Sequence, residues 1–507
     1  MIEGPAPPGP GALDDPAYGR PERSALGGNV RRGLAWKGAS QLTAQIARTS
    51  MTIILAHLLT PRDFGLAGMV LIFSGLIQLL TDVGFSASLV QLKTITEADR
   101  STAFWFSMFL SLACFGVAVL VSPYVASFYG QPRLRWMFVA IASGLLTGSL
   151  TTTQASLLWR SMNFRALETR AMAAAVASAV VGIAAAVGGL GAWSLILQAL
   201  ALSAASTITI WIFSPWKPQF MFSRESLRRM ARFSSNVFFS RFLTYGDRNL
   251  DNLLVGRFLG SAPLGIYSLS YSVILIPFER IVSPVQNVLY PAFATIQDDL
   301  KQMRTLWLRG VRLIATIMFP AMAGVIVVAP DFVSVVLGRR WTGATTIVQI
   351  FAWVALIQSL AILNSAVWQS RSKTGLLLRF TACAFALDAT AFVVGLHFGV
   401  RGVATGYAIT NTFAIVPVGL FIMGRLLEVR PNVFIGELRG VIEATVVMAA
   451  ATWALRHELI SIGVAPGIRL PAAVLAGIAV YVLMCLWRER RAFEELDPRR
   501  FRTIATP

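Results

Sequence analysis

Charged residues are scarce in this chain of 507 residues, because Asp, Glu, Lys and Arg together account for only 14% of it. A soluble domain usually contains about 25% of these residues. Hydrophobic residues make up 55% of the chain, and its mean hydropathy is +0.65. The length alone would suggest about three globular domains, but so few charges could not cover three water-exposed surfaces. The composition therefore predicts a membrane protein, and it disfavours a soluble enzyme, a disordered protein and a DNA-binding protein.

Residues that form disulfides or bind metals are also rare. The three cysteines, Cys114, Cys383 and Cys485, lie in separate apolar runs without a CxxC pair, and the three histidines have no neighbouring ligand at metal spacing. This pattern argues against a disulfide framework and a zinc site. The chain has no Gly-Lys dipeptide, hence no Walker A motif, and no GxSxG or HExxH motif. We therefore expect a transporter without catalytic residues, metal or cofactor, rather than an enzyme.

Apolar runs long enough to cross a bilayer are abundant. About 20 apolar residues in a helix span the hydrocarbon core, where every backbone polar group must be paired. We expect fourteen such helices, at about 36–59, 64–84, 102–122, 133–155, 169–188, 191–213, 232–255, 263–287, 311–330, 343–366, 375–397, 400–424, 440–455 and 470–487. The helix at 440–455 is short, and residues 331–340 could form a turn at the membrane surface.

The basic residues orient these helices and account for the net charge of +19. With the N-terminus in the cytoplasm, 31 of the 44 basic residues fall in cytoplasmic loops and tails, 9 in exoplasmic loops and 4 inside the spans. Cytoplasmic loops of membrane proteins are enriched in Lys and Arg, so this distribution predicts that both termini are cytoplasmic. The first long apolar run begins near Leu34, so we expect no cleaved signal peptide and a disordered tail over 1–33.

The chain resembles itself at an offset of about 200 residues. Gly65 in the segment LAHLLTPRDFGLAG corresponds to Gly265 in LVGRFLGSAPLGIY, and the same offset places Arg48 on Arg248. A second pair, GGLGAWSL at 188–195 and GVRGVATG at 399–406, has an offset of 211. These offsets cover six helices, so they predict two parallel six-helix bundles with two further helices. Transporters with internal repeats usually bind substrate between the repeats, near the membrane midplane.

Two helices carry polar residues at helical spacing on one face. In the helix at 36–59 these are Gln41, Gln45, Arg48 and Thr52, and in the helix at 232–255 they are Arg241, Thr244, Arg248 and Asp251, flanked by Asp247. A charge inside the membrane is costly and usually functional, and guanidinium groups bind phosphate in a bidentate manner. The stripes therefore predict a wet cavity in which Arg48, Arg241 and Arg248, with Gln45, bind an anionic lipid head group. Alternatively, the two acids neutralise the arginines of the second helix and only hold the bundle together.

Other charged residues within the spans leave two interpretations open. Glu279 and Arg280 lie between Pro277 and Pro284, and they could form a gate, a cavity pair that holds substrate, or a local ion pair. Asp388 lies centrally in the helix at 375–397. It could carry a coupling proton, or it could be a hydrogen-bonded structural residue.

Several segments of the chain resemble one membrane-protein family. They are LLTPRDFGLAGMVLIFSGLIQLLTDVGFSASLVQ (58–91), WRSMNFRALETR (159–170), GGLGAWSLILQ (188–198), DNLLVGRFLGSAPLGIYSLSY (251–271) and VLYPAFATIQDD (288–299). In this order, over about residues 31–430, they are similar to Wzx-type lipid-linked oligosaccharide flippases, of the multidrug/oligosaccharidyl-lipid/polysaccharide exporter superfamily.

The resemblance implies an all-α polytopic protein of the bacterial cytoplasmic membrane, with two six-helix lobes in a V-shaped arrangement. It implies alternating access that moves undecaprenyl-pyrophosphate-linked repeat units to the outer leaflet for O-antigen, capsule or exopolysaccharide assembly. Possible partners are the polymerase and chain-length regulator of the same pathway. The expected organisation is a tail at 1–33, an N-lobe at 34–213, an inter-lobe loop at 214–231, a C-lobe at 232–424, helices 13 and 14 at 425–487, and a basic tail at 488–507.

Three alternatives remain open at this stage. A drug/cation antiporter of the same superfamily should have a net acidic cavity, whereas the predicted cavity is net basic. A membrane enzyme of polysaccharide assembly, such as a polymerase, would be expected to carry a large exoplasmic loop, and the loops predicted here are short. A structural scaffold of the biosynthetic complex would be insensitive to mutations in the cavity.

Overall fold

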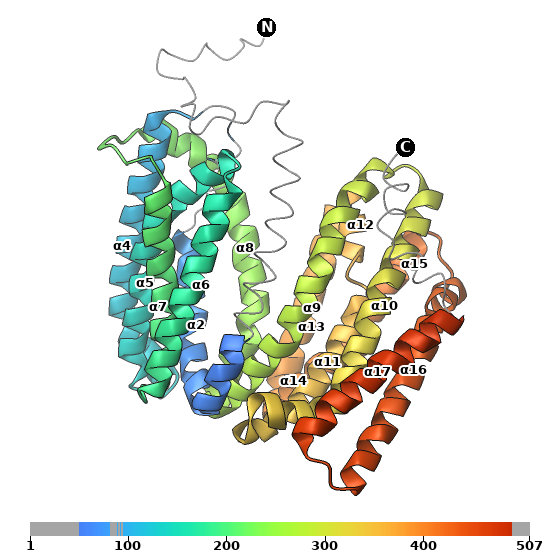
Figure 1. Cartoon of the computed structure of the whole chain (residues 1–507). Coiled ribbons are helices and arrows are strands. Elements are labelled where there is room, and N and C mark those ends of the chain that lie inside the picture. The colour runs from blue at the N-terminus through green and yellow to red at the C-terminus, as the bar shows by residue number, and fades with distance from the viewer. Residues whose placement is uncertain (1–49, 82–88, 90–91, 93–94, 489–507) are drawn as a thin grey trace. The chain divides into compact units, whose positions relative to one another are not determined.

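The computed structural model describes residues 50–81, 89, 92 and 95–488, and all regular structure in these ranges is helical (Figure 1). Nine helices within the described ranges are long and apolar enough to cross a membrane. The expected all-α, multi-pass membrane class is therefore confirmed. Contacts between helices divide the chain into two compact units, Met1–Ala262 and Pro263–Pro507, each of which we describe by itself.

The N-terminal unit is a bundle of long helices. Its described helices are a segment at 50–58, α2 (Pro61–Thr81), α4 (Glu97–Phe128), α5 (Leu134–Arg160), α6 (Phe164–Val187), α7 (Trp193–Phe213) and α8 (Arg224–Phe258). A capping box starts α4, because the Thr96 hydroxyl accepts from Asp99 N (3.2 Å) while the Asp99 carboxylate accepts from Thr96 N (2.9 Å). This exchange pairs donors that a helix start leaves unpaired.

The second unit is also helical throughout its described part. Its α-helices are α9 (Ser261–Thr295, of which the first two residues belong to the N-terminal unit), α10 (Leu300–Phe332), α11 (Thr345–Ser359), α12 (Asn364–Ser370), α13 (Thr374–Leu396), α14 (Gly399–Thr410), α15 (Val416–Leu426), α16 (Pro431–Ser461) and α17 (Pro466–Arg488). The helix expected at 440–455 is longer than predicted, since α16 has 31 residues. Charges such as the Arg439–Glu443 pair lie on its surface and do not end it.

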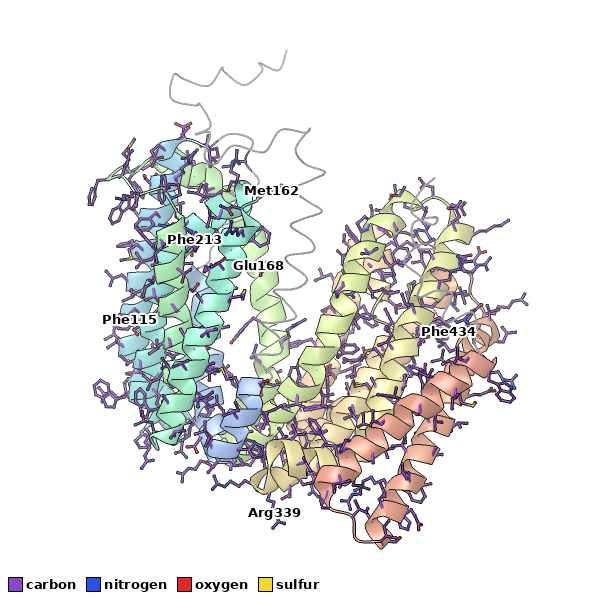
Figure 2. All side chains as sticks on the ribbon, in the orientation of Figure 1. Phe115, Met162, Glu168, Phe213, Arg339 and Phe434 are labelled. Atoms are coloured by element: carbon purple, nitrogen blue, oxygen red, sulfur yellow. The ribbon has the colours of Figure 1, made fainter. Side chains whose placement is uncertain are left out.

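The region expected as a possible surface turn at 331–340 is largely helical. The α10 helix continues through Asp331, and a π-helix over Val333–Leu337 follows it. Gly338 then turns the chain with φ of 96°, a conformation that favours glycine, into a 3₁₀ helix over Arg339–Ala344. Arg339 is exposed at this turn (Figure 2).

Apolar side chains occupy both the interior and the outer surface of the units. In the N-terminal unit, Phe104, Leu157, Ile210 and Trp216 are buried together in one core cluster. Many other apolar side chains of the spans, such as Leu120, are mostly exposed. Exposed apolar surface on this scale is expected where lipid replaces water as the solvent.

The internal repeat is visible in how the helices end. Met162 after α5 and Ser372 after α12 both have positive φ, 55° and 56°, and the next residue of each donates its N–H back to the helix, to Leu158 O and Trp368 O. Gly189 after α6 and Gly399 after α13 have φ of 77° and 70°. Both pairs are 210 residues apart, one residue less than the 211 expected for this part of the repeat.

The α8 helix packs against α2 within the N-terminal unit. Gly75 of α2 makes room for it, because a Cβ atom on Gly75 would stand 2.3 Å from the Tyr245 hydroxyl. Gly65 of α2 lies instead against the first residue of α9, where an added Cβ atom would stand 1.7 Å from the backbone oxygen of Ser261. The Tyr245 hydroxyl also donates to Ile72 O (2.5 Å). Within the described residues, the contact therefore includes close packing at Gly75 and a hydrogen bond from Tyr245.

The last two helices pack along α10. The ring of Phe434 in α16 stacks on Trp307 of α10 at 5.4 Å (Figure 2), and the hydroxyl of Tyr481 in α17 donates to Thr316 O (2.7 Å). Asp331 completes these ties, because both Arg456 of α16 and Arg469 of α17 bind its carboxylate. The C-terminal helix pair is therefore an integral part of the second unit.

Candidate functional site

The described residues include only part of the predicted cavity. Gln45 and Arg48 lie outside them. Arg241 and Asp247 lie in α8, and Glu279 and Arg280 lie in α9, but their side chains are outside the described part. Substrate binding and gating by these six residues therefore stay predictions.

Arg248 and Asp251 can be placed. Arg248 is exposed, and Asp251 is buried, with one carboxylate oxygen accepting from Asn252 N (2.7 Å). Three residues apart on one helix, they lie on neighbouring parts of one face. These two residues of the α8 stripe therefore lie at the boundary between the buried and the exposed surface of the helix.

Tyr245 connects this stripe to α2. It lies one turn before Arg248, and its hydroxyl donates to the Ile72 carbonyl of α2. Its own carbonyl accepts from the Asn249 side chain (2.9 Å). A movement of α8 that carried Arg248 would therefore have to break a contact with α2.

A second group of polar residues, here called the polar network, lies within the second unit. It consists of Gln358, Asp388, Tyr407, Thr410 and Asn411. The Gln358 amide donates to the Tyr407 hydroxyl (2.8 Å) and to the Asn411 side-chain oxygen (2.9 Å), while the Thr410 hydroxyl donates to Asp388 (2.5 Å). A π-helix over Asn411–Ile415 starts in this network, and such bulges in α-helices often occur at functional sites.

The helix that carries Gln358 is broken close to this network. Helix α11 ends at Ser359 and α12 begins at Asn364. The carbonyl of Ile362 in the break accepts from the Gln286 amide of α9 (2.7 Å), so a side chain satisfies a group that the break releases. Broken helices within a membrane are tolerated where protein or a cavity supports them, and in transporters they often lie near substrate sites.

Buried carboxamides occupy equivalent positions in the two halves. Gln154 in α5 and Asn364 in α12 are 210 residues apart, and both are buried. Within the described part of the chain, neither side chain has a hydrogen-bond partner for its nitrogen or its oxygen. The sequence analysis missed Gln154, because a glutamine in an apolar helix gave no signal without the structural register of the repeat.

Three ion pairs between helices were also missed. Asp331 accepts from Arg456 Nε (2.6 Å) and from Arg469 Nε (3.0 Å), and Asp99 pairs with Arg229. The partners of Asp331 are 125 and 138 residues away. Helical periodicity reports only which residues share a helix face, so it could not pair residues on different helices.

The groups at these sites can bind and neutralise charge, and they can exchange hydrogen bonds with a polar solute. In the described ranges, no three His, Cys, Asp or Glu side chains are placed to hold a metal ion. Guanidinium and carboxamide groups within membrane-spanning helices suit recognition of an anionic, hydroxyl-rich solute.

The fold and the site define a multi-pass helical membrane protein with polar groups held within its helices, and the comparisons specify the family. The chain belongs to the polysaccharide biosynthesis protein family, whose model matches residues 54–346. It is 25% identical to the teichuronic acid biosynthesis protein TuaB of Bacillus subtilis over 404 residues, which cover 78% of this chain and 82% of TuaB. It is also 25% identical to the lipopolysaccharide biosynthesis protein WzxC of Escherichia coli over 390 residues, which cover 75% and 78%. The predicted resemblance to Wzx-type proteins is confirmed.

The fold is shared with a solved transporter structure. The lipid II flippase MurJ in an inward closed conformation superposes with a TM-score of 0.70 at 13% identity, covering 89% of this chain and 98% of MurJ. This likeness shows the fold.

Proposed function

We propose that the protein flips lipid-linked oligosaccharide repeat units across the bacterial cytoplasmic membrane. The observation that carries this proposal is the family match over 54–346, together with relatives named for the biosynthesis of two cell-surface polysaccharides. Surface polymers are assembled from precursors made inside the cell, so their pathways need a protein that moves a polar, lipid-anchored solute. A multi-pass helical protein with charged groups in its helices supports this role.

The substrate is proposed to be an undecaprenyl-pyrophosphate-linked repeat unit, for O-antigen, capsule or exopolysaccharide assembly. Its pyrophosphate would bind the guanidinium groups of Arg48, Arg241, Arg248 and Arg280, with Gln45 donating further hydrogen bonds. Arginine suits this task, because it stays charged when buried and binds phosphate oxygens in pairs. The exposed position of Arg248 on α8 supports its access to a solute.

The direction of transport follows from the proposed orientation. With both termini in the cytoplasm, fourteen spans and two repeat-related lobes in a V-shaped arrangement, at 34–213 and 232–424, would open alternately to the two leaflets. The 31 to 9 distribution of basic residues supports this orientation. The helices at 425–487 would accompany the second lobe, which agrees with their ties to α10. The segments 1–33 and 488–507 would be cytoplasmic tails, and 214–231 the loop between the lobes.

The contact of α8 with α2 is proposed to open and close during transport. In the repeat, α8 begins the second half of the sequence, yet it packs on a helix of the first half. Within the described part of the chain, this contact includes a close approach at Gly75 and a hydrogen bond from the Tyr245 hydroxyl, both of which would be lost when the helices separate. Asp247 and Asp251 of α8 and Glu279 of α9 are proposed to act in gating.

Asp388 is proposed to couple transport to an ion gradient. Its carboxylate lies in the polar network, next to a π-helix, and it accepts a hydrogen bond from Thr410 of another helix. Gain or loss of a charge at Asp388 would change that bond and the packing of α13 on α14. A polymerase and a chain-length regulator of the same pathway are proposed as partners.

The direct test is a flipping assay with the purified protein in vesicles that contain a fluorescent lipid-linked oligosaccharide. Flipping moves the label to the outer leaflet, where a membrane-impermeant reductant quenches it. We expect flipping with the wild-type protein, and accumulation of inner-leaflet repeat units in a deletion strain. Efflux of cationic dyes without flipping would instead support the antiporter, and polymer formation from supplied units would support an enzyme. If Arg48→Ala and Arg248→Ala both flip at the wild-type rate, binding of phosphate by these arginines is wrong.

A further inference from the structure

The connection between α7 and α8, residues 214–223, is tied to the first turns of α4 (Figure 1). Gln219 N donates to the Ser101 hydroxyl (3.1 Å), and Ser223 N donates to the Thr102 hydroxyl (2.9 Å). In return, the Trp105 indole donates to Gln219 O (2.8 Å). The connection therefore follows a fixed path over the end of the unit.

Trp216 holds the start of the same connection against α4. Its ring is buried in the core cluster around Phe104, and its indole nitrogen donates to the Glu97 carboxylate in the first turn of α4 (2.8 Å). One side of the connection is thus covered by the protein, through both apolar packing and hydrogen bonds.

The opposite side of the connection is apolar and uncovered. Three consecutive side chains are exposed: Phe220 by 92%, Met221 by 45% and Phe222 by 55%. The Phe220 ring stacks on Trp105, with 4.9 Å between ring centres. Because the backbone is held at Gln219 and Ser223, folding keeps these side chains outward. Contiguous exposed apolar side chains mark a surface that meets a membrane or another molecule.

Basic residues surround this apolar tip. Lys217 precedes it, and Arg224 and Arg228 follow in the first turns of α8; all three are exposed. Glu225 is the acidic residue of this stretch. Aromatic and apolar side chains next to exposed cations are typical of segments that lie in the head-group region of a bilayer and bind anionic lipids.

The tip lies at one end of the helical bundle. Phe213 at the end of α7 and Met162 after α5 lie at the same end of the unit (Figure 2). In the proposed orientation this end faces the cytoplasm. A short connection that leaves a span here must run close to the membrane surface, where head groups are within reach.

We propose that residues 217–228 form a membrane anchor. Phe220, Met221 and Phe222 insert into the head-group region of the cytoplasmic leaflet, while Lys217, Arg224 and Arg228 bind its anionic phospholipids. Trp105 supports the inserted Phe220 from behind. The anchor fixes the depth of the N-terminal unit in the bilayer, and it makes the link between the two halves of the chain a lipid-bound element. It rests on the proposed orientation and not on flipping.

The depth of the tip tests this proposal in the full-length protein. A nitroxide label is placed at Met221→Cys, after Cys114, Cys383 and Cys485 have been changed to alanine, and the protein is reconstituted in vesicles of phosphatidylethanolamine and phosphatidylglycerol. We expect the label to collide with oxygen several times more often than with a polar nickel chelate. A label at Glu225→Cys is the matched control, and it should favour the nickel chelate. Equal nickel access at both positions would show that the tip lies in water, and this would overturn the proposal.

Two further experiments test whether the tip binds anionic lipid and whether it lies in the cytoplasmic leaflet. In vesicles of phosphatidylcholine alone, the ratio of oxygen to nickel collisions at position 221 should fall; an unchanged ratio would overturn binding of anionic lipid. A membrane-impermeant maleimide should label Glu225→Cys in inverted membrane vesicles and not in intact cells. Labelling in intact cells would overturn the assignment to the cytoplasmic leaflet. None of these measurements requires transport, so their outcome is independent of the flipping assay.

Discussion

Gly65 of α2 lies directly against the backbone of Ser261, so that a Cβ atom added to Gly65 would stand 1.7 Å from the Ser261 carbonyl oxygen. Backbone atoms cannot move aside as a flexible side chain can, so Gly65→Ala must push α2 away from the start of α9. Overpacking of this kind costs about 1–3 kcal/mol. We expect a lower thermal unfolding temperature of the purified variant and reduced export in a complementation assay.

Gly116 in α4 provides the matched control for this substitution. A Cβ atom there would meet nothing within 4 Å, and alanine forms helices better than glycine. Gly116→Ala should therefore unfold at the wild-type temperature or slightly above it. Equal unfolding temperatures for both variants would show that α2 moves aside at little cost.

Cross-linking tests whether the contact of α8 with α2 must open. In the cysteine-free background, Ile72→Cys and Tyr245→Cys are joined by a short bifunctional thiol reagent. We expect flipping to fall at least tenfold, on the order of 1.4 kcal/mol or more in rate terms, and to recover after reduction. The reason is that, in the proposed transport cycle, α8 moves with the second half of the repeat and separates from α2.

A second pair of positions controls for cross-linking itself. The hydroxyls of Thr147 in α5 and Ser203 in α7 are 2.6 Å apart within the N-terminal unit. Joining Thr147→Cys to Ser203→Cys in the same way should leave flipping intact, because these helices are expected to move together. Full transport with the Ile72 and Tyr245 positions joined would mean that their contact is permanent.

Removal of the Asp331 carboxylate should destabilise the second unit. Asp331→Asn leaves the partly buried guanidinium groups of Arg456 and Arg469 without their counter-charge. Loss of one partner from a buried ion pair typically costs about 3–5 kcal/mol. The thermal unfolding temperature of the purified protein measures this loss. In a separate experiment, the rate of proteolysis in the connection between α16 and α17 should rise.

Two variants show whether uncompensated charge is the cause. A triple variant with leucine at Asp331, Arg456 and Arg469 removes all the charges and should recover most of the lost stability. Glu443→Gln breaks an exposed pair with Arg439 and should change little. A triple variant as unstable as Asp331→Asn would point to lost hydrogen-bond geometry instead.

Asp388 and Thr410 should respond differently if Asp388 couples an ion to transport. Asp388→Asn can still accept the hydrogen bond from Thr410 but cannot gain or lose a charge. We expect this variant to fold normally and to lose the dependence of flipping on an imposed ion gradient. Thr410→Val removes the hydrogen bond and should mainly lower stability, by about 1 kcal/mol.

The opposite result would identify Asp388 as a structural residue. In that case Asp388→Asn would respond to the gradient as the wild-type protein does, and Thr410→Val would be the more damaged of the two in the thermal unfolding assay. Measurement of folding and gradient response on the same preparations separates these outcomes.

The class of the fold could be predicted from the sequence alone, because a long apolar run indicates a helix that is surrounded by lipid. The span expected at 102–122 lies within α4, and the span expected at 375–397 differs from α13 by one residue at each end. Helix ends were predicted less well. The charges near Arg439 do not end α16, and the helical segments after Asp331 replace an expected turn. Apolar length predicts where a helix is in lipid, whereas capping and packing decide where it stops.

The candidate site was predicted by residue type but not by pairing. The sequence singled out Asp388 as a central charge without a partner on its own helix, and its partner, Thr410, lies on the next helix. It missed the ties of Asp331 to Arg456 and Arg469 and the equivalence of Gln154 with Asn364. To predict such pairs, one must know how the helices are aligned in space. The periodicity of residues along a single helix does not give this alignment.

The turns that end α5 and α6 recur 210 residues later with the same backbone conformation, at Met162 and Ser372 and at Gly189 and Gly399. These turns mark equivalent positions in the two halves. Segments of related chains could be exchanged at these positions. A hybrid joined at equivalent turns would keep every later helix facing the same neighbours. A junction misplaced by one residue would rotate the following helix by about 100°, and would turn polar groups meant for the interior toward lipid.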